Sequence, residues 1–162
     1  MSFGQAVSAF FSNYANFRGR TRRSGYWWVA LAVVIVSIPL AVVDMALFRG
    51  LWPQNLLDAG FGPVSALFFA VVAIPSVSLG VRRLHDTGRS GWWILLPAAL
   101  GIAQSAVITT GGVAAMTSVL SIALGLLTLA ASIALLVFYV QDSQPGENAY
   151  GPNPKEAQSP TL

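Results

Sequence analysis

The chain lacks cysteine entirely, contains one histidine, His85, and has charged side chains at only 9% of its positions. The absence of cysteine excludes disulfides, thiol nucleophiles and zinc sites built from cysteine and histidine. A single imidazole cannot supply the paired ligands of a bis-histidine haem. We therefore predict neither a cofactor nor a metal site.

The shortage of charge also separates the chain from water-soluble proteins, in which about a quarter of residues are charged. Of the 162 residues here, 55% are hydrophobic, which is more than a water-soluble core can absorb. The net charge of +3 comes from nine lysines and arginines, and eight of them lie beside long apolar runs. This placement is typical of a membrane topology signal, so we expect no nucleic-acid partner.

The apolar runs predict the fold class, because about 20 residues of helix cross the hydrocarbon core of a bilayer. We expect a single polytopic all-α membrane domain with four transmembrane helices, at about 26–48, 61–81, 92–108 and 115–140. Turn-forming residues predict a loop at 49–60, with Pro53, Asn55, Asp58 and Gly60, and a turn at Thr109-Thr110-Gly111-Gly112. Prolines, among them Pro145, Pro152, Pro154 and Pro160, predict an irregular tail at 141–162.

The N-terminal segment, residues 1–25, is amphipathic and then basic. Phe3, Val7, Phe10, Tyr14 and Phe17 recur at steps of four and three, which is typical of one face of a helix. This helix either packs on the rest of the protein or lies in the membrane interface, and the two roles are compatible.

The distribution of basic residues predicts the orientation in the membrane. Eight of the nine lysines and arginines fall on one side of the four spans, and only Arg49 falls on the other. The side with more basic residues faces the cytoplasm in most membrane proteins, so we expect both termini to be cytoplasmic. Asp44 falls near the far end of the first span, where we expect a helix-end group rather than a proton relay.

Two further patterns concern how the helices associate. Ser118, Ser121, Gly125, Thr128 and Ser132 place small residues on one face of the last span, which favours close contact with another helix. The segments Arg23-Ser24-Gly25-Tyr26-Trp27-Trp28 and Arg89-Ser90-Gly91-Trp92-Trp93 each precede an outward-going helix. They indicate either a duplicated hairpin or the basic and aromatic start that such helices share.

The segment from Arg82 to Trp93 is the densest polar cluster in the middle of the chain. Helical spacing would allow Asp86 to pair with Arg82 or with Arg89, as expected of a charged helix end. Alternatively, the arginines beside Trp92 and Trp93 hold the phosphates of anionic lipids. Catalysis by His85 is disfavoured, because no serine, cysteine or second carboxylate has the spacing of a catalytic partner.

Three blocks of residues resemble a known family. They are Phe11-x2-Tyr14-x2-Phe17-x-Gly19-Arg20-x2-Arg23-x2-Tyr26-Trp27, the segment Arg82 to Trp93, and Asn148-x-Tyr150-Gly151-x2-Pro154. They are similar to the three characteristic blocks of domain-of-unknown-function family 805, and the resemblance covers nearly the whole chain. It implies a small bacterial inner-membrane protein with about four helices, and it implies no reaction.

The resemblance and the predicted orientation together place all three blocks on the cytoplasmic side. We expect them to assemble into one polar cap, in which the tail satisfies backbone groups of the loop. The residues expected in this cap, or in contact with lipid headgroups, are Arg20, Arg23, Arg82, Arg83, His85, Asp86, Arg89, Trp92, Trp93, Asn148 and Tyr150. None of them is assigned a catalytic, cofactor-binding or metal-binding role.

The resulting hypothesis is a non-enzymatic envelope or lipid-associated factor of the bacterial inner membrane. Its expected partners are membrane lipids, including anionic phospholipids, with a membrane protein or a second copy of the chain as further possibilities. A small transporter or channel subunit is the alternative, and it would place polar residues around a cavity at mid-membrane. An intramembrane enzyme is the third reading, and it would need a nucleophile or a metal cluster.

Overall fold

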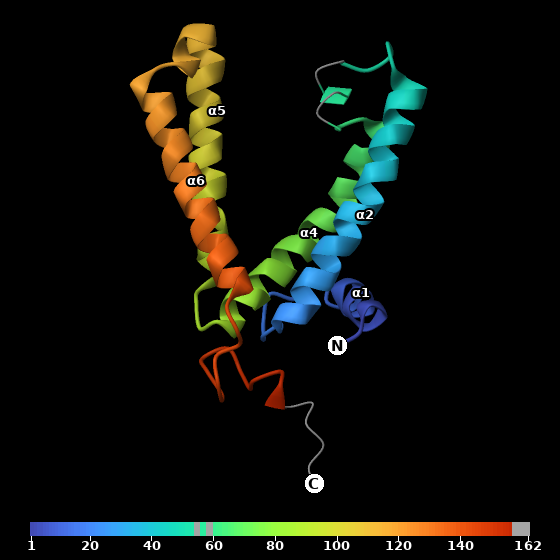
Figure 1. Ribbon diagram of the computed structural model, residues 1–162, viewed down its shortest axis with the longest axis vertical. Helices are drawn as coiled ribbons and strands as arrows, with labels where there is room; N and C mark the ends of the chain where they lie inside the picture. Colours follow the sequence, from blue (N-terminus) through green and yellow to red (C-terminus); the bar gives the residue numbers. More distant parts are fainter. Residues whose placement is uncertain (54–55, 58–59, 157–162) are drawn as a thin grey trace. The chain divides into compact units, whose positions relative to one another are not determined.

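The computed structural model describes residues 1–53, 56–57 and 60–156, so the predicted loop residues Asn55 and Asp58 and the tail residue Pro160 lie outside the described residues. The helical elements, shown in Figure 1, are α1 (Phe3–Ser12), α2 (Arg23–Phe48), α4 (Pro63–Asp86), η1 (Gly91–Ile94), α5 (Leu95–Met116) and α6 (Val119–Val140). Within this part of the chain, four stretches are long and apolar enough to cross a membrane: Arg23–Phe48, Pro63–Asp86, Gly91–Gly112 and Val119–Val140. The predicted all-α class with four transmembrane helices is confirmed.

The chain forms two compact units. Unit 1 contains Met1–Phe17 and Ser24–Leu79, and unit 2 contains Arg18–Arg23 and Gly80–Leu162. Helix α4 therefore contributes its first part to unit 1 and its last turns, from Gly80, to unit 2.

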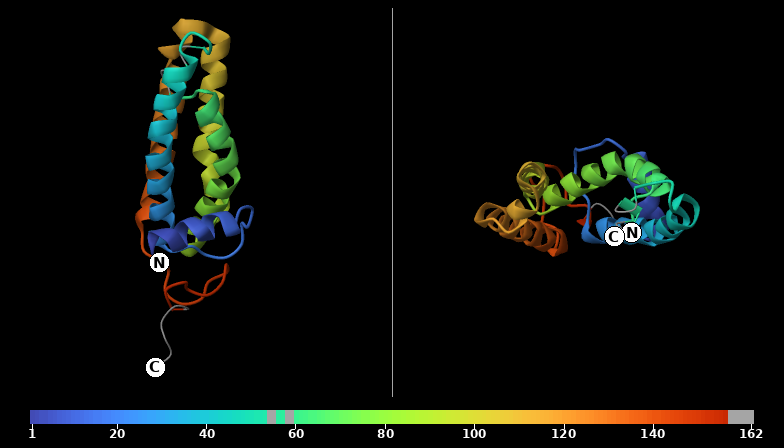
Figure 2. Two further views of the ribbon diagram at one scale, coloured as in Figure 1. Left: turned by 90° about the vertical axis from the view of Figure 1, so that its right-hand side faces the viewer. Right: turned by 90° about the horizontal axis from the view of Figure 1, so that it is seen from above.

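In unit 1, the short helix α1 begins with a capping box that its sequence encodes. The side chain of Ser2 accepts a hydrogen bond from the Gln5 backbone N–H, and the Gln5 side chain accepts one from the Ser2 backbone N–H at 2.8 Å. This pair satisfies two of the N–H groups that a helix start leaves unpaired. Figure 2 shows α1 lying across the N-terminal end of α2.

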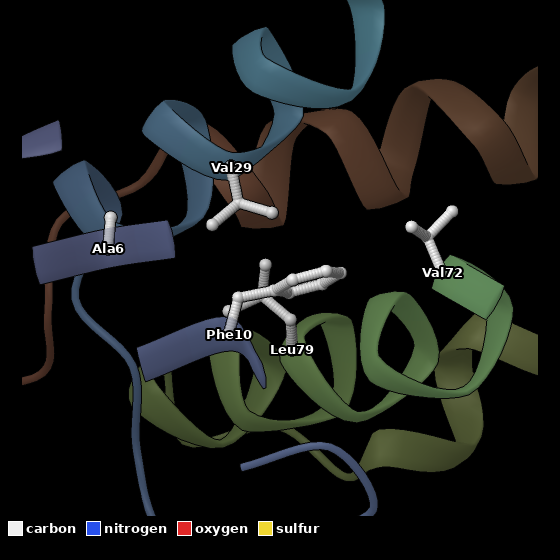
Figure 3. Packing of buried hydrophobic residues seen from close by; sticks show 5 residues of the cluster. All are labelled: Ala6, Phe10, Val29, Val72 and Leu79. Carbon is white, nitrogen blue, oxygen red and sulfur yellow. The ribbon is translucent and has the colours of Figure 1, made fainter. Parts of the chain in front are cut away.

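A small apolar core holds α1 to α2 and α4 within unit 1. Its buried side chains come from all three helices and converge on one another (Figure 3); they are Ala6, Phe10, Val29, Val72 and Leu79. Phe3 and Phe11 remain about half exposed, at 45% and 50%. The helix thus packs on unit 1 with one face, as the first of the two predicted roles requires, and keeps aromatic surface exposed. Its place in the membrane interface stays a prediction.

The amphipathic pattern overestimates the length of α1. The helix ends at Ser12, and the chain continues through Tyr14 and Phe17 in non-helical conformation. The cause is Asn13, whose backbone N–H and side-chain Nδ2 both donate to the Ala9 carbonyl and so close the last turn. Asparagine is common at such ends because its side chain competes for backbone groups.

Tyr14 has a specific role beyond the end of α1. Its hydroxyl donates a hydrogen bond of 2.6 Å to the backbone carbonyl of Val71, within α4. That carbonyl lacks its usual helical partner because residue 75 is proline, which has no N–H to donate four residues later. Tyr14 therefore satisfies the acceptor that the proline leaves free, and it fastens the N-terminal segment to α4.

Asp44 lies close to the end of α2, as predicted, and its contacts there are structural. Its carboxylate is 1% exposed and accepts hydrogen bonds from the backbone N–H groups of Val64 and Ser65, at 2.9 and 2.8 Å. These two residues begin α4, so one helix supplies the N-terminal cap of the next.

In unit 2, α5 and α6 lie side by side as a helical hairpin (Figure 1). The predicted turn at 109–112 is confirmed in part, because the backbone of Gly112 is not helical and the long apolar stretch ends there. A short helical segment then continues to Met116, and the chain turns again at Thr117 and Ser118. Thr109 and Thr110 remain helical, and their hydroxyls donate to carbonyls four residues earlier in α5. Gly112, with a φ of 64° and a ψ of −156°, forms a kink between two helical segments of α5, and the Ser118 side chain then caps α6.

The small residues of α6 face α5 only in part. Ser121 is buried, and Gln104 of α5 donates a hydrogen bond of 3.5 Å to its carbonyl. A side chain at Gly125 would meet the amide group of the same Gln104, at 3.1 Å from a Cβ. Ser132, by contrast, is exposed, because the buried stripe continues through Ala131, Leu135 and Tyr139.

Candidate functional site

The polar cap described here comprises residues 18–23, 82–93 and 141–156, all of which belong to unit 2. Helix α4 continues to Asp86, beyond the predicted end of the span at Val81, so the first polar residues of the central cluster are helical. The helix then ends at Gly88, whose φ of 74° is a conformation that other residues rarely adopt. The N–H groups of Gly88 and Arg89 bond to the carbonyls of His85 and Leu84, which is a Schellman motif.

Asp86 is the centre of the polar cap, and its side chain is fully buried. Its Oδ1 accepts a hydrogen bond of 3.2 Å from Arg20 Nε. Its Oδ2 accepts hydrogen bonds from Arg83 Nη1 and, at 2.6 Å, from the hydroxyl of Ser143 in the tail. One carboxylate thus joins three segments of the chain, and each of its oxygens has a charged partner.

Arg20 connects the N-terminal segment to the tail. Beyond Asp86, its guanidinium donates to three backbone carbonyls, those of Gln144 at 2.6 Å, Gly146 at 2.8 Å and Gly151 at 3.1 Å. Its side chain is only 1% exposed. The tail folds around this guanidinium and satisfies its donors, which offsets the cost of burying a charged group.

Arg83 connects the end of α4 to the end of α6. Its Nε donates to the Tyr139 carbonyl at 3.2 Å, and its Nη2 donates to the Gln141 carbonyl. The last carbonyls of a helix lack intrahelical partners and carry partial negative charge, so a cation is favourable there. Arg23 reaches the same helix end, with a longer hydrogen bond of 3.4 Å to the Val140 carbonyl.

His85 is held between the N-terminal segment and the tail. Its ring stacks on that of Tyr150, with centroids 3.8 Å apart and planes within 2° of parallel. Its Nδ1 lies 3.2 Å from the Gly19 carbonyl, an acceptor, so Nδ1 carries the proton. Asn148 donates to the His85 carbonyl at 3.0 Å, so the tail satisfies a backbone group of the α4 end.

The residues after Gly88 form the part of the polar cap that contacts α6. Arg89 lies over the ring of Phe138 in α6, 4.0 Å from its centroid, and also donates to the Thr87 carbonyl. Trp93 packs edge-on against the same Phe138, whereas Trp92 is 78% exposed. An exposed tryptophan at the end of an apolar span is typical of the headgroup region.

Arg82 is the arginine of this group without a side-chain partner. The residue is 7% exposed, and its Nε and Nη2 are buried and make no hydrogen bond to the described residues. Its backbone carbonyl accepts a hydrogen bond of 3.0 Å from the N–H of Thr21.

The structure therefore assembles Arg20, Arg23, Arg83, His85, Asp86, Asn148 and Tyr150, and it gives Arg82 and Arg89 different surroundings from those predicted. Both predicted pairs, Arg82 with Asp86 and Asp86 with Arg89, are wrong. The reason is that Arg20, Arg83 and Ser143 occupy both oxygens of the carboxylate. Ser143 and Gln144 were not predicted, because they have no sequence signal beyond their position just before the third block.

The outer part of the tail is fastened by a weaker contact. Lys155 donates to Asp142 at 2.5 Å, and both side chains are about half exposed. The Lys155 ammonium holds the pKa of the Asp142 carboxyl below its usual range. This pair stabilises the folded tail at neutral pH and loses that effect as the pH falls through the lowered pKa, but an exposed pair contributes little.

Comparison with known proteins identifies the family. The family model described as protein of unknown function (DUF805) matches residues 14–152. This chain belongs to the DUF805 family. The chain is similar to the inner membrane proteins YhaH and YhaI of Escherichia coli K12, at 31% and 29% identity over 143 residues. These alignments cover 88% of the chain and 90% and 89% of the two relatives.

The range matched by the family model includes the cap segments 18–23 and 82–93 and most of the third segment. The matched range begins at Tyr14, which fastens the N-terminal segment, and ends next to Gly151, whose carbonyl Arg20 binds. A third relative, the uncharacterized protein YiiR of Escherichia coli K12, is 32% identical over 83 residues, about half of each chain. No solved structure matches the chain.

Proposed function

We propose that this DUF805 protein is a non-enzymatic, lipid-associated factor of the bacterial inner membrane, and that its polar cap binds anionic phospholipid at the cytoplasmic surface. The observation that carries the proposal is the collection of arginines into one ordered assembly at one end of the spans of unit 2. That assembly lies beside an exposed tryptophan, Trp92.

The charge of unit 2 favours an anionic partner. This unit has eight lysines and arginines but four aspartates and glutamates. Of the four acids, Asp86 is buried and already shared by Arg20 and Arg83. Basic residues next to a membrane-spanning helix attract anionic lipids, by about 1 kcal/mol for each charge near the surface.

The polar side chains of the cap are already engaged in contacts with one another and with the backbone, which argues against catalysis there. His85 is engaged by Gly19 and Tyr150, and Asp86 by two arginines and a serine, so neither is poised as a free base. Among the residues that the structure describes, no three metal-binding side chains lie together. What remains is a polar cap with a net positive charge, which suits binding rather than reaction.

Lipid retention tests the proposal directly. The full-length protein is extracted in a mild detergent, and native mass spectrometry identifies the lipids that remain bound. We expect phosphatidylglycerol or cardiolipin to remain in preference to phosphatidylethanolamine, which outnumbers them in many bacterial inner membranes. Retention in proportion to the lipids of the source membrane would contradict the proposal.

The orientation is tested separately, and the absence of cysteine makes the test simple. Single substitutions are made at exposed positions at the two ends of unit 2, Thr117→Cys in the turn after α5 and Glu147→Cys in the tail. On intact spheroplasts, a membrane-impermeant thiol reagent should label the Thr117→Cys protein and not the Glu147→Cys protein. The opposite labelling would reverse the orientation, and disrupted membranes, where both should react, provide the control.

A further inference from the structure

We infer that Arg82 is the residue of the polar cap that binds a phosphate oxyanion, through the edge of its guanidinium formed by Nε and Nη2. The inference rests on the proposed function and makes it specific, because it selects one arginine from a cluster. Its basis is the buried, unpartnered state of these two nitrogens.

The other arginines of the central cluster are already engaged. Arg83 bonds to Asp86 and to two carbonyls at the end of α6. Arg89 lies over Phe138 and donates to the Thr87 carbonyl. Neither can offer its full donor set to a ligand without breaking contacts that hold unit 2 together. The Nε and Nη2 of Arg82, by contrast, have no hydrogen-bond partner among the described residues.

The geometry of the free edge indicates the chemistry of the ligand. Nε–H and one N–H of Nη2 point in parallel from the same side of the guanidinium, so they match two oxygens of a phosphate or carboxylate. The nearest carboxylate of the helix, on Asp86, is already bound by Arg20, Arg83 and Ser143. The ligand must therefore come from outside the described residues.

The energetics favour occupation of this edge. A buried guanidinium with unsatisfied donors destabilises the folded protein, because it has lost water and gained no partner. An oxyanion that binds Nε and Nη2 restores both hydrogen bonds and offsets the charge. The binding of such a ligand should thus stabilise the protein, since anything that binds only the folded state does so.

A phosphodiester of an anionic lipid and a free phosphate ion both have this chemistry, and thermal unfolding can separate them. The full-length protein and its variants are purified in a neutral detergent. The midpoint temperature is then measured after addition of phosphatidylglycerol, phosphatidylcholine or inorganic phosphate. Arg82→Met removes the guanidinium while keeping an apolar stem, and Arg82→Lys keeps the charge without the fork. Arg49→Met, at an exposed position outside the polar cap, is the control for loss of one positive charge.

We expect phosphatidylglycerol, and not phosphatidylcholine, to raise the midpoint of the parent protein and of Arg49→Met. The rise should be absent in Arg82→Met, and Arg82→Lys should need about tenfold more phosphatidylglycerol for the same rise, the loss expected for one charge-assisted hydrogen bond. Without added lipid, Arg82→Met should be at least as stable as the parent, because it no longer buries an unpaired charge. If Arg82→Met does not fold, the response of Arg82→Lys to phosphatidylglycerol alone tests the inference.

The outcomes separate the inference from the proposed function. If Arg82→Met and Arg82→Lys respond to phosphatidylglycerol as the parent does, Arg82 is not the ligand, although lipid association stands. If only inorganic phosphate raises the midpoint, and only when Arg82 is present, the site stands and the lipid association fails. If neither compound affects the parent, both are overturned.

Discussion

Replacement of Asp86 by alanine should reduce the free energy of unfolding by about 3 kcal/mol and release the tail. Removing one member of a buried ion pair typically costs about 3 to 5 kcal/mol, because its partners remain buried and unpaired. Here the loss should fall near the lower limit, since Arg20 and Arg83 keep their bonds to backbone carbonyls. The Ser143 hydroxyl also loses its acceptor, and that contact ties the tail to α4.

Two measurements check this expectation. The first is the thermal unfolding of the detergent-solubilised protein, and the second is the rate at which a protease cleaves the tail in inside-out vesicles. Asp142→Asn is the control, because it removes a tail carboxylate whose partner, Lys155, is about half exposed. That change should cost under about 1 kcal/mol. If Asp86→Ala and Asp142→Asn have the same stability and the same cleavage rate, Asp86 does not hold the cap together.

The spans were the most predictable part of the fold. In a bilayer the backbone must satisfy its own hydrogen bonds, so a long apolar run has few alternatives to a helix. The first span, predicted at about 26–48, is α2 (Arg23–Phe48), and the last, predicted at 115–140, is α6 (Val119–Val140). Hydropathy does not mark the boundary between α5 and α6, because both helices are apolar. The predicted glycine turn locates the kink at Gly112 but not the second turn at Thr117 and Ser118, where Ser118 caps α6.

Composition identified the segments of the polar cap but not their pairings. Local spacing on α4 offered Asp86 a partner at Arg82 or Arg89, and the structure pairs it with Arg83 and with Arg20, which lies 66 residues away in the chain. Such a choice depends on which side chains tertiary packing buries together, and the helical period says nothing of that. For the same reason, the sequence could not predict that Nε and Nη2 of Arg82 have no partner, because that depends on where all the neighbouring side chains lie.

The two related segments at Arg23 and Arg89 differ in their local structure. Arg23 begins the long helix α2, whereas Arg89 lies in the loop after Gly88, and Ser90 caps the short η1. Similar residues therefore begin two spans by different means. A basic residue followed by tryptophan places a helix start at the membrane surface, and it leaves the backbone conformation of that start open.

Replacement of Asp44 by alanine should destabilise unit 1 by about 2 kcal/mol. The reason is that Asp44, a residue of α2, caps the start of α4. Its two oxygens accept from the backbone N–H groups of Val64 and Ser65, at the start of α4. Alanine would leave both donors without a partner in a buried place, and each such loss costs about 1 to 3 kcal/mol when no water replaces it. The negative charge also lies where the helix dipole favours it.

Asparagine at this position tests whether both oxygens matter. It offers one acceptor, and its amide NH2 must face the other backbone N–H, so Asp44→Asn should lose most of the stability that Asp44→Ala loses. Ser37→Ala is the control on the same helix, because the Ser37 hydroxyl only donates to the Val34 carbonyl within α2. Thermal unfolding in detergent should rank Ser37→Ala with the parent and both Asp44 variants well below it. Equal midpoints for Asp44→Ala and Ser37→Ala would contradict this expectation. They would show that the hydrogen bonds from the Val64 and Ser65 N–H groups to Asp44 contribute nothing to the stability of unit 1.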